Sequence, residues 1–194
     1  QQDGLNYMRR NIDAWWPLVE KKEVEAIIVT ASGCGVTVKE YGHLLRYDSV
    51  YAGKAATIST LAKDISEILH AELGNLQHLF SQKHTALKTK LSFHSPCTLQ
   101  HGMQIRGVVE EILQAAGFEL SYVANAHLCC GSAGTYSILQ PELSQQLLKN
   151  KLAALESSNP DHIATANIGC LMHLKSGAAL PVKHWIELLD ERLS

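Results

Sequence analysis

Two adjacent cysteines followed by a glycine, Cys129-Cys130-Gly131, constrain this chain more than any other feature. Neighbouring cysteines do not easily form a disulfide with each other, because their side chains diverge from adjacent Cα atoms. Both can reach one object several ångströms wide, such as an iron–sulfur cluster. Cys97, beside Pro96, and Cys170, beside Gly169, complete a set of four cysteines at predicted strand-to-helix turns. This set indicates a site for a soft metal.

The composition is that of an ordinary globular protein. With 194 residues, 46% of them hydrophobic, the chain can form one or two domains with a sizeable core. Its net charge of -2 gives no basic surface for nucleic acid. The longest apolar runs, such as 26–31, are too short to span a bilayer, so we expect no transmembrane segment. The odd count of five cysteines fits metal or redox cysteines in a reducing cytoplasm better than a disulfide framework.

Short apolar runs alternate with amphipathic segments along the chain. We expect strands over 24–31, 90–94, 118–123 and 162–167. We expect helices over 5–22, 36–45, 51–73, 96–116, 141–156 and 183–193, with a kink or early end at Pro17 and a polar connection over 75–89. The alternation predicts an α/β fold in three layers with a mostly parallel sheet. The five cysteines follow predicted strands and should converge at one sheet edge.

An internal repeat divides the chain. Residues 25–34 resemble residues 161–170 with one insertion, and both copies end in Gly-Cys between two helical segments. The second copy is preceded by the other three cysteines of the set, whereas the first has only its Gly33-Cys34 end. We therefore predict a duplicated module, with the C-terminal part of a truncated first module over 1–75 and a complete second module over 76–194.

The surroundings of the cysteines favour thiolates. A cysteine at a helix N-terminus gains from unpaired N–H groups, and small neighbours such as Gly131 let the backbone approach a cluster and donate N–H groups to its sulfurs. Histidines nearby are further candidates, and His173 lies one helical turn after Cys170. For each single histidine, an ordinary hydrogen-bonded role is the stronger expectation. These histidines are His94, His101, His127 and His173.

Taken together, these segments resemble the cysteine-rich CCG domain of the glycolate oxidase iron–sulfur subunit family. The resemblance rests on residues 94–101, 127–136 and 165–170, with further matches at 30–35, 39–42 and 182–187. It covers essentially the whole chain. More distantly, the chain is similar to the cysteine-rich subunit of heterodisulfide reductase and to the lactate-utilisation iron–sulfur proteins.

The resemblance implies a set of ligands. Cys97, Cys129, Cys130 and Cys170 would hold an iron–sulfur cluster lined by Gly131, and aerobic preparation would leave the site empty. The wider family pattern ends in Cys-x-x-Cys, but here the last position is His173, which puts a five-cysteine noncubane cluster in doubt. A 4Fe–4S cluster held by four cysteines is expected, and a fifth ligand from Cys34 or His173 stays open.

The resemblance also implies a role and partners. The chain would be a cytoplasmic subunit, peripheral to the inner membrane, that passes electrons from flavin-containing subunits oxidising glycolate to an acceptor. It would lack the N-terminal ferredoxin-like part of its own chain and be inactive alone.

One alternative is a thiol/disulfide redox enzyme of the heterodisulfide reductase type. Another is a zinc-stabilised interaction domain, although structural zinc sites usually pair cysteines at Cys-x-x-Cys spacing. Residues 131–134 are glycine-rich but lack the lysine of a nucleotide-binding P-loop, so we do not expect a nucleotide site there.

Overall fold

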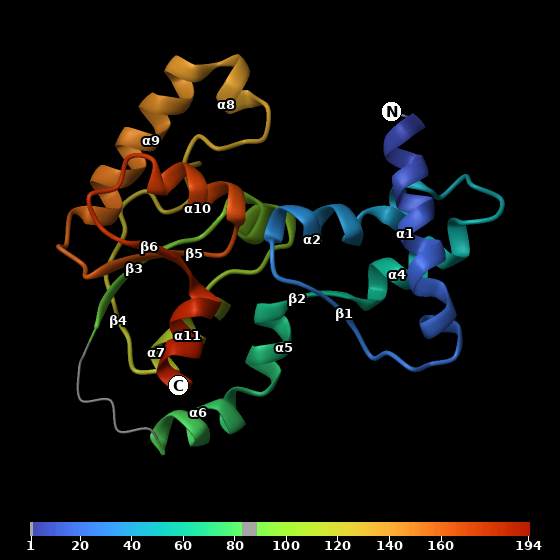
Figure 1. Ribbon diagram of the computed structural model, residues 1–194, viewed down its shortest axis with the longest axis horizontal. Helices are drawn as coiled ribbons and strands as arrows, with labels where there is room; N and C mark the ends of the chain where they lie inside the picture. Colours follow the sequence, from blue (N-terminus) through green and yellow to red (C-terminus); the bar gives the residue numbers. More distant parts are fainter. Residues whose placement is uncertain (1, 83–88) are drawn as a thin grey trace. The chain divides into compact units, whose positions relative to one another are not determined.

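Parallel strands joined through helices form both halves of the chain, as the alternating sequence pattern predicts (Figure 1). The computed structural model describes residues 2–82 and 89–194. These residues divide into two units, Gln1–Ile65 and Ser66–Ser194. Strands in both units pair in parallel, which confirms the α/β class.

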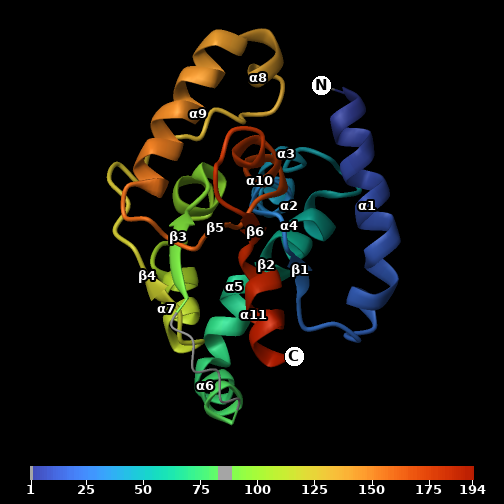
Figure 2. The same cartoon turned by 60° about the vertical axis from the view of Figure 1, so that its left-hand side comes forward.

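The second unit is built on four parallel strands in the order β4-β3-β5-β6. The strands are β3 (Lys90–His94), β4 (Glu119–Leu120), β5 (His162–Thr165) and β6 (Val182–His184). The helices described in this unit are α6 (Leu73–Ser81), η1 (Thr98–Gly102), α7 (Val108–Ala115), α8 (Tyr136–Leu139), α9 (Pro141–Glu156), α10 (Ile168–Lys175) and α11 (Trp185–Leu193). Figures 1 and 2 show α9 and α10 on one face of the sheet and α7 and α11 on the other, so this unit has three layers.

An apolar core fills the space between the sheet and the α9–α10 face. Leu148 and Leu155 from α9 meet Ile163 of β5 and Leu174 of α10, and Cys130 belongs to the same cluster. Leu155, Ile163 and Leu174 have no measurable exposure. Pro141 starts α9, where its missing N–H leaves no bond unmade. This core holds α9 and α10 in place beside the cysteine turns.

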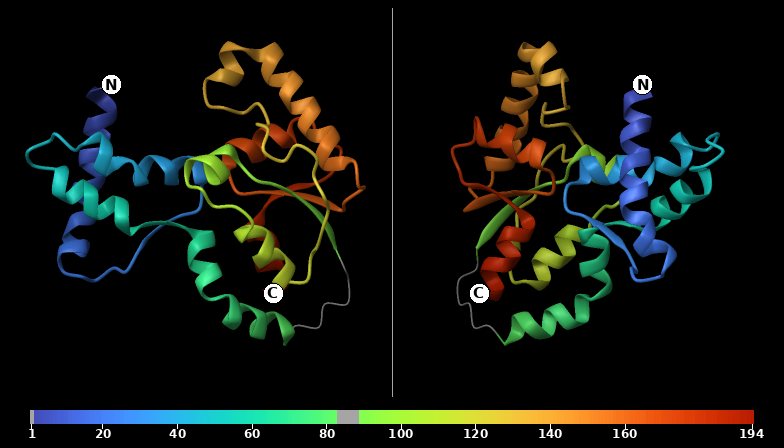
Figure 3. Two further views of the ribbon diagram at one scale, coloured as in Figure 1. Left: turned by 180° about the vertical axis from the view of Figure 1, so that it is seen from behind. Right: turned by 45° about the vertical axis from the view of Figure 1, so that its right-hand side comes forward.

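The first unit contains a two-stranded parallel sheet. Its strands are β1 (Ile27–Val29) and β2 (Ala62–Asp64), and its helices are α1 (Gln2–Glu20), α2 (Ser32–Lys39), α3 (Tyr41–Leu44) and α4 (Ala52–Leu61). The helix α5 (Ile65–Ala71) follows β2 and belongs to the second unit from Ser66 on. In Figure 3, α1 lies across α4 within this unit. Ile12 of α1, Ala55 and Ile58 of α4 are fully buried in its core. The helix α1 runs through Pro17 and ends at Glu20.

The two copies of the repeat adopt the same local order of elements. In each copy a strand, β1 or β5, leads into a helix, α2 or α10, and pairs in parallel with a later strand that precedes another helix. The assignment of residues 1–75 to a truncated first module and of 76–194 to a complete second one stays a prediction.

The expected long helix over 51–73 is wrong, because β2 interrupts it. Ala62 and Asp64 are buried, and they pair with Ile27 and Val29 of β1. Burial and pairing against β1 outweigh the helical propensity of this alanine-rich segment, which is a tertiary effect that a local pattern does not reveal.

The expected helix over 96–116 is also wrong in its middle. It consists of the short π-helix η1, a turn with positive φ at Gln104 (60°) and Gly107 (78°), and then α7. Positive φ at Gln104 and Gly107 ends the helical course, and the buried Gln100 before this turn donates hydrogen bonds to the carbonyl oxygens of Ser95 (2.9 Å) and Ala126 (3.3 Å). The connection expected over 75–89 is partly helical in α6, and its residues 83–88 lie outside the described ones.

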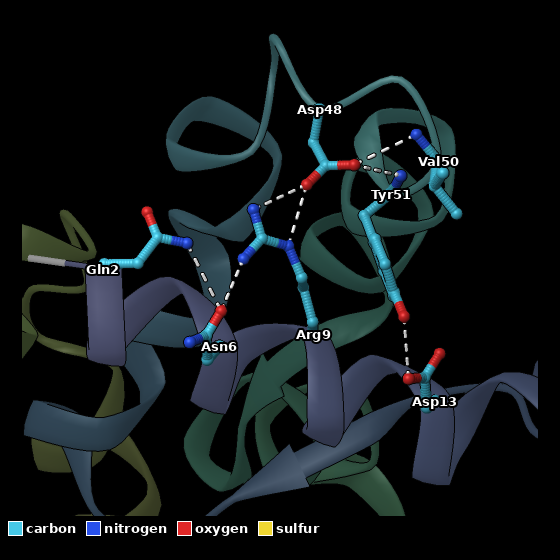
Figure 4. A network of polar contacts seen from close by, with 7 residues as sticks. All are labelled: Gln2, Asn6, Arg9, Asp13, Asp48, Val50 and Tyr51. Atoms are coloured by element: carbon cyan, nitrogen blue, oxygen red, sulfur yellow. Dashed lines mark hydrogen bonds and ion pairs between the residues drawn. The ribbon is translucent and has the colours of Figure 1, made fainter.

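Polar contacts tie α1 to the loop before α4 (Figure 4). The Arg9 guanidinium donates to a carboxylate oxygen of Asp48 at 2.8 Å, and the other oxygen accepts from the backbone N–H groups of Val50 and Tyr51 at 3.0 Å. The Tyr51 hydroxyl in turn donates to Asp13 of α1 at 2.8 Å. The N–H group of Val50, the Arg9 side chain and the N–H group of Tyr51 together hold the pKa of Asp48 below its ordinary value of 3.8.

We expect Asp48→Asn to weaken the docking of α1 near neutral pH, because the substitution removes the charge that these donors stabilise. A carboxyl group with a lowered folded pKa stabilises the fold above its unfolded pKa, and this contribution is lost as the pH falls through the folded pKa. The difference in the free energy of opening of α1, measured by amide hydrogen exchange, should therefore shrink as the pH is lowered below about 4. The exposed Glu20→Gln is the control, and a pH-independent deficit in Asp48→Asn would contradict this account.

Candidate metal centre

The carboxyl ends of β3 and β5 position two of the candidate ligands. These strands are neighbours, and their last residues, His94 and Thr165, are paired. Cys97 follows β3 at the start of η1, and Cys170 lies in the first turn of α10. Asn167 caps α10 by accepting a hydrogen bond from the N–H group of Gly169 at 2.8 Å. Parallel pairing therefore brings the two turns to the same edge of the sheet.

The Cys129-Cys130 turn reaches this edge because it packs closely on α9. Gly131 has a φ of 96°, and a Cβ atom at this position would lie 2.4 Å from the carbonyl oxygen of Ser144. The Ser144 hydroxyl also donates to the carbonyl oxygen of Gly131 at 2.9 Å. Only glycine fits here without a shift of the backbone. The predicted role of Gly131 at the site stays a prediction, but its close approach to α9 gives a structural reason for the residue.

The four cysteines of the second unit form one continuous group of thiols. Side-chain hydrogen bonds join Cys97 to Cys129, Cys129 to Cys130 and Cys130 to Cys170. Cys130 is 1% exposed, and the other three are partly buried. The expectation that these residues converge is therefore confirmed for Cys97, Cys129, Cys130 and Cys170. Cys34 lies in the first unit, and its part in that expectation stays a prediction.

The surroundings of Cys129 favour its thiolate. A hydrogen bond from the thiol of Cys130 lowers the pKa of Cys129 most, and a second hydrogen bond from the thiol of Cys97 lowers it further. The backbone N–H groups of Gly131, at 3.3 Å from Sγ, and of Ala133 lower this pKa further. These donors offset the burial of the sulfur, which acts in the opposite direction. The glycine-containing turn is thus built to hold a thiolate.

The surroundings of Cys170 also favour its thiolate. A hydrogen bond from Cys130, together with the nearby ring of His94, lowers the pKa of Cys170 to about 5. The pKa values of Cys97 and Cys130 are raised, first because each donates a hydrogen bond to Cys129. Thiols and thiolates therefore alternate along the group, and a bound metal would take the thiols as thiolates as well.

His94 belongs with these sulfurs, although sequence reasoning assigned it an ordinary hydrogen-bonded role. Its ring is 1% exposed, and a ring nitrogen and the Sγ atoms of Cys130 and Cys170 all lie within 4.8 Å of one another. Neither ring nitrogen makes a hydrogen bond of ordinary geometry among the described residues, but the ring lies near enough to Cys170 to lower the pKa of that thiol. The signal in the sequence was its position as the last residue of a strand, directly before the Ser-Pro-Cys turn.

The other candidate residues lie elsewhere. The Nε2 atom of His173 lies 3.3 Å from the hydroxyl of Ser144 on α9. His101 is exposed and lies 3.3 Å from the carbonyl oxygen of His127. Cys34 is exposed in the first unit, where it lines a cavity of about 500 Å³ with Trp15 and neighbouring residues. The assignment of Cys34 or His173 as a fifth ligand is a prediction that the structure does not test.

Two residues that sequence reasoning missed donate hydrogen bonds to the loop that precedes Cys129. The ammonium of Lys151, on α9, donates to the carbonyl oxygens of Asn125 (3.0 Å) and Ala126 (3.3 Å) in the loop before Cys129. The amide of Gln100 donates to Ala126 as well. A lysine and a glutamine in amphipathic segments carry no signal of burial, so only the fold reveals these contacts.

The donor set suits a soft metal or an iron–sulfur cluster. It contains two cysteines whose surroundings favour the thiolate, two further thiols and an imidazole whose buried nitrogens make no hydrogen bond of ordinary geometry among the described residues. Thiolate and imidazole are the ligands of zinc sites and of several iron–sulfur clusters. An unpaired buried polar group is costly, and a metal ion would satisfy it. The residues present therefore fit such a group.

Comparison with known proteins finds one matching family and several relatives. The family described as CCG: Cysteine-rich domain matches residues 91–175. The glycolate oxidase iron-sulfur subunit of Escherichia coli (strain K12) is 49% identical over 193 residues, which are 100% of this chain and 46% of that protein. The probable glycolate oxidase iron-sulfur subunit of Bacillus subtilis (strain 168) is 34% identical over 90% of this chain and 38% of its own length. Lactate utilization protein A of Anoxybacillus flavithermus is 25% identical over 96% of this chain and 79% of its own length.

We expect Gly131→Ala to destabilise the second unit by about 2–4 kcal/mol, because it adds a close contact with Ser144 to the strain of a positive φ. Gly134→Ala is the matched control, since Gly134 also has a positive φ (55°) but no atom within 4 Å of an added Cβ. Urea unfolding of the reduced protein measures both variants. Equal losses of unfolding free energy in the two variants would show that the close packing on α9 contributes nothing.

Proposed function

We propose that this chain, whose residues 91–175 match the cysteine-rich CCG domain, is the iron–sulfur electron-transfer part of a 2-hydroxy-acid oxidoreductase whose substrate is glycolate. The observation that carries the proposal is the single group of thiols and imidazole at the ends of β3 and β5. Relatives named as glycolate oxidase iron-sulfur subunits support glycolate, and those named lactate utilization protein A make lactate the next candidate.

Iron is favoured over zinc by the arrangement of the sulfurs. Structural zinc sites usually take pairs of cysteines at Cys-x₂₋₄-Cys spacing, and this chain has no such pair. Adjacent cysteines that both reach the same site suit an object wider than one ion. The group also offers five donor side chains, one more than tetrahedral zinc needs.

Each residue would have a distinct task toward a 4Fe–4S cluster. Cys97, Cys129, Cys130 and Cys170 would hold it, and His94 is placed to be the fifth donor. The cluster, when bound, supplies one-electron transfer. The N–H groups beside Cys129 stabilise its sulfur as an anion, and the apolar core around Cys130 limits the access of water.

The partners follow from the relatives. The chain spans less than half the length of the two glycolate oxidase subunits that it matches, which leaves room in such proteins for a ferredoxin-like N-terminal part. We infer that flavin-containing subunits oxidise the 2-hydroxy acid and that this chain passes the electrons on. We place the complex in the cytoplasm, at the surface of the inner membrane. Among the described residues, no helix is both long and apolar enough to cross a membrane.

We expect anaerobic reconstitution with iron and sulfide to load the chain, and each serine substitution of Cys97, Cys129, Cys130 or Cys170 to remove most of the bound iron. Iron analysis and the visible absorption spectrum measure the outcome. Cys34→Ser is the matched control, because Cys34 is an exposed cysteine of the other unit. Iron retained in Cys130→Ser, or zinc bound in preference to iron, would contradict the assignment.

The fifth position is tested by the same assay. We expect His94→Ala to lose or alter the cluster and His173→Ala to keep it, since only the His94 ring lies in the group of possible ligand atoms. Loss of iron in Cys34→Ser or His173→Ala, with His94→Ala unaffected, would move the fifth ligand to one of those residues.

A thiol/disulfide redox enzyme is the second candidate, favoured by one observation. Cys129 lines a cavity of about 210 Å³, so a small substrate could approach its sulfur. We expect the isolated chain to reduce no disulfide and to oxidise no glycolate, whereas the complex with its flavin subunits should show glycolate-dependent dye reduction that Cys129→Ser abolishes. Disulfide reduction by the isolated loaded chain would favour the alternative. Unchanged dye reduction in the Cys129→Ser complex would place this site off the electron path.

A further inference from the structure

Lys151 is a buried lysine without a carboxylate partner. It lies on α9 and is 3% exposed. Among residues 2–82 and 89–194, its ammonium donates to the backbone carbonyl oxygens of Asn125 and Ala126 and to no other group. In the part of the chain that the structure describes, no carboxylate forms an ion pair with it. Because lysine is almost never fully buried unless it is paired, the negative charge that balances it must come from another kind of group.

The four cysteines supply that charge. Burial lowers the pKa of Lys151, and the thiols of Cys130, Cys97, Cys129 and Cys170 all act against this shift. Lys151 and Cys129 also line the same cavity of about 210 Å³, together with Leu128 and Leu147. Lys151 and Cys130 are both buried, and buried charges interact more strongly than charges in water do.

On the premise that the site holds the proposed iron–sulfur cluster, we propose that Lys151 is the fixed counter-charge of that cluster and raises its reduction potential. Reduction adds one electron, and hence one negative charge, to the cluster and its thiolates. The Lys151 ammonium stabilises this reduced form more than the oxidised form, because the attraction grows with the charge on the cluster. Lys151 is thus a positioning and tuning residue that acts through charge and binds no iron.

The same lysine also anchors the loop that carries the adjacent cysteines, so the two roles must be separated. Gln100 offers the comparison, because its amide donates to the carbonyl oxygen of Ala126 at 3.3 Å, the same distance as the Lys151 ammonium. Gln100 anchors the loop from the Cys97 side without a charge. A change at Gln100 therefore loosens the loop and leaves the electrostatics largely intact.

The test uses the full chain, reconstituted anaerobically with iron and sulfide, and measures the midpoint potential by redox titration followed by electron paramagnetic resonance. Lys151→Met and Lys151→Gln both remove the charge, and glutamine keeps a hydrogen-bond donor. Lys151→Arg keeps the charge, and the adjoining cavity leaves room for the guanidinium. Gln100→Met removes an anchor only, and Lys149→Met removes an exposed lysine of the same helix.

We expect Lys151→Met and Lys151→Gln to shift the midpoint potential to more negative values at wild-type iron content. Lys151→Arg, Gln100→Met and Lys149→Met should stay close to the wild type. An unchanged potential in a fully loaded Lys151→Gln overturns the inference but leaves the iron–sulfur function intact. A shift of equal size in Gln100→Met also overturns it, because the effect then belongs to the loop anchor.

Loss of the cluster in the neutral variants is decisive as well, provided that circular dichroism shows them to be folded. Iron retained in Lys151→Arg then supports the counter-charge, and iron lost in Lys151→Arg too overturns it. A wild-type chain that binds no iron under these conditions overturns the proposed function itself, and the inference with it.

Discussion

The parallel pairing of β3 with β5 is the constraint on which the site depends. It sets His94 opposite Thr165, so that the Cys97 turn and the first turn of α10 start at the same sheet edge. The third contributor, the Cys129-Cys130 turn, comes from a different stretch of chain. It reaches the edge only because Gly131 lets the backbone lie against α9. Three segments far apart in the sequence therefore supply one group of donor atoms.

Buried thiolates repel one another and lose their hydration, and several groups of the second unit offset these costs. Backbone N–H groups of the glycine turn donate to Cys129, and the ring of His94 stabilises Cys170 as an anion. Behind the turn, Lys151 brings a full positive charge into the same low-dielectric region. A bound cation or cluster would add the charge that lets the remaining thiols lose their protons. The arrangement has the character of a functional site, since mere packing needs none of these donors.

Much of this arrangement could be predicted from the sequence, and the rest depended on contacts between distant segments. The strand over 90–94 and the helix over 141–156 have the predicted bounds, because the alternation of Leu91 and Phe93 with polar residues marks the strand and a starting proline marks the helix. The short strand β2 was missed, because only its pairing with β1 makes that alanine-rich segment extended. His94 and Lys151 were not assigned to the site, since nothing local distinguishes a buried histidine or lysine from an exposed one.

The most direct test of the account is a crystal structure of the anaerobically reconstituted chain, with anomalous diffraction data collected on both sides of the iron absorption edge. We predict iron density at the carboxyl ends of β3 and β5, in contact with the sulfurs of Cys97, Cys129, Cys130 and Cys170 and beside the His94 ring. Iron bound elsewhere, or a single zinc ion at this edge, would contradict the central claim that these turns are built to hold an iron–sulfur cluster.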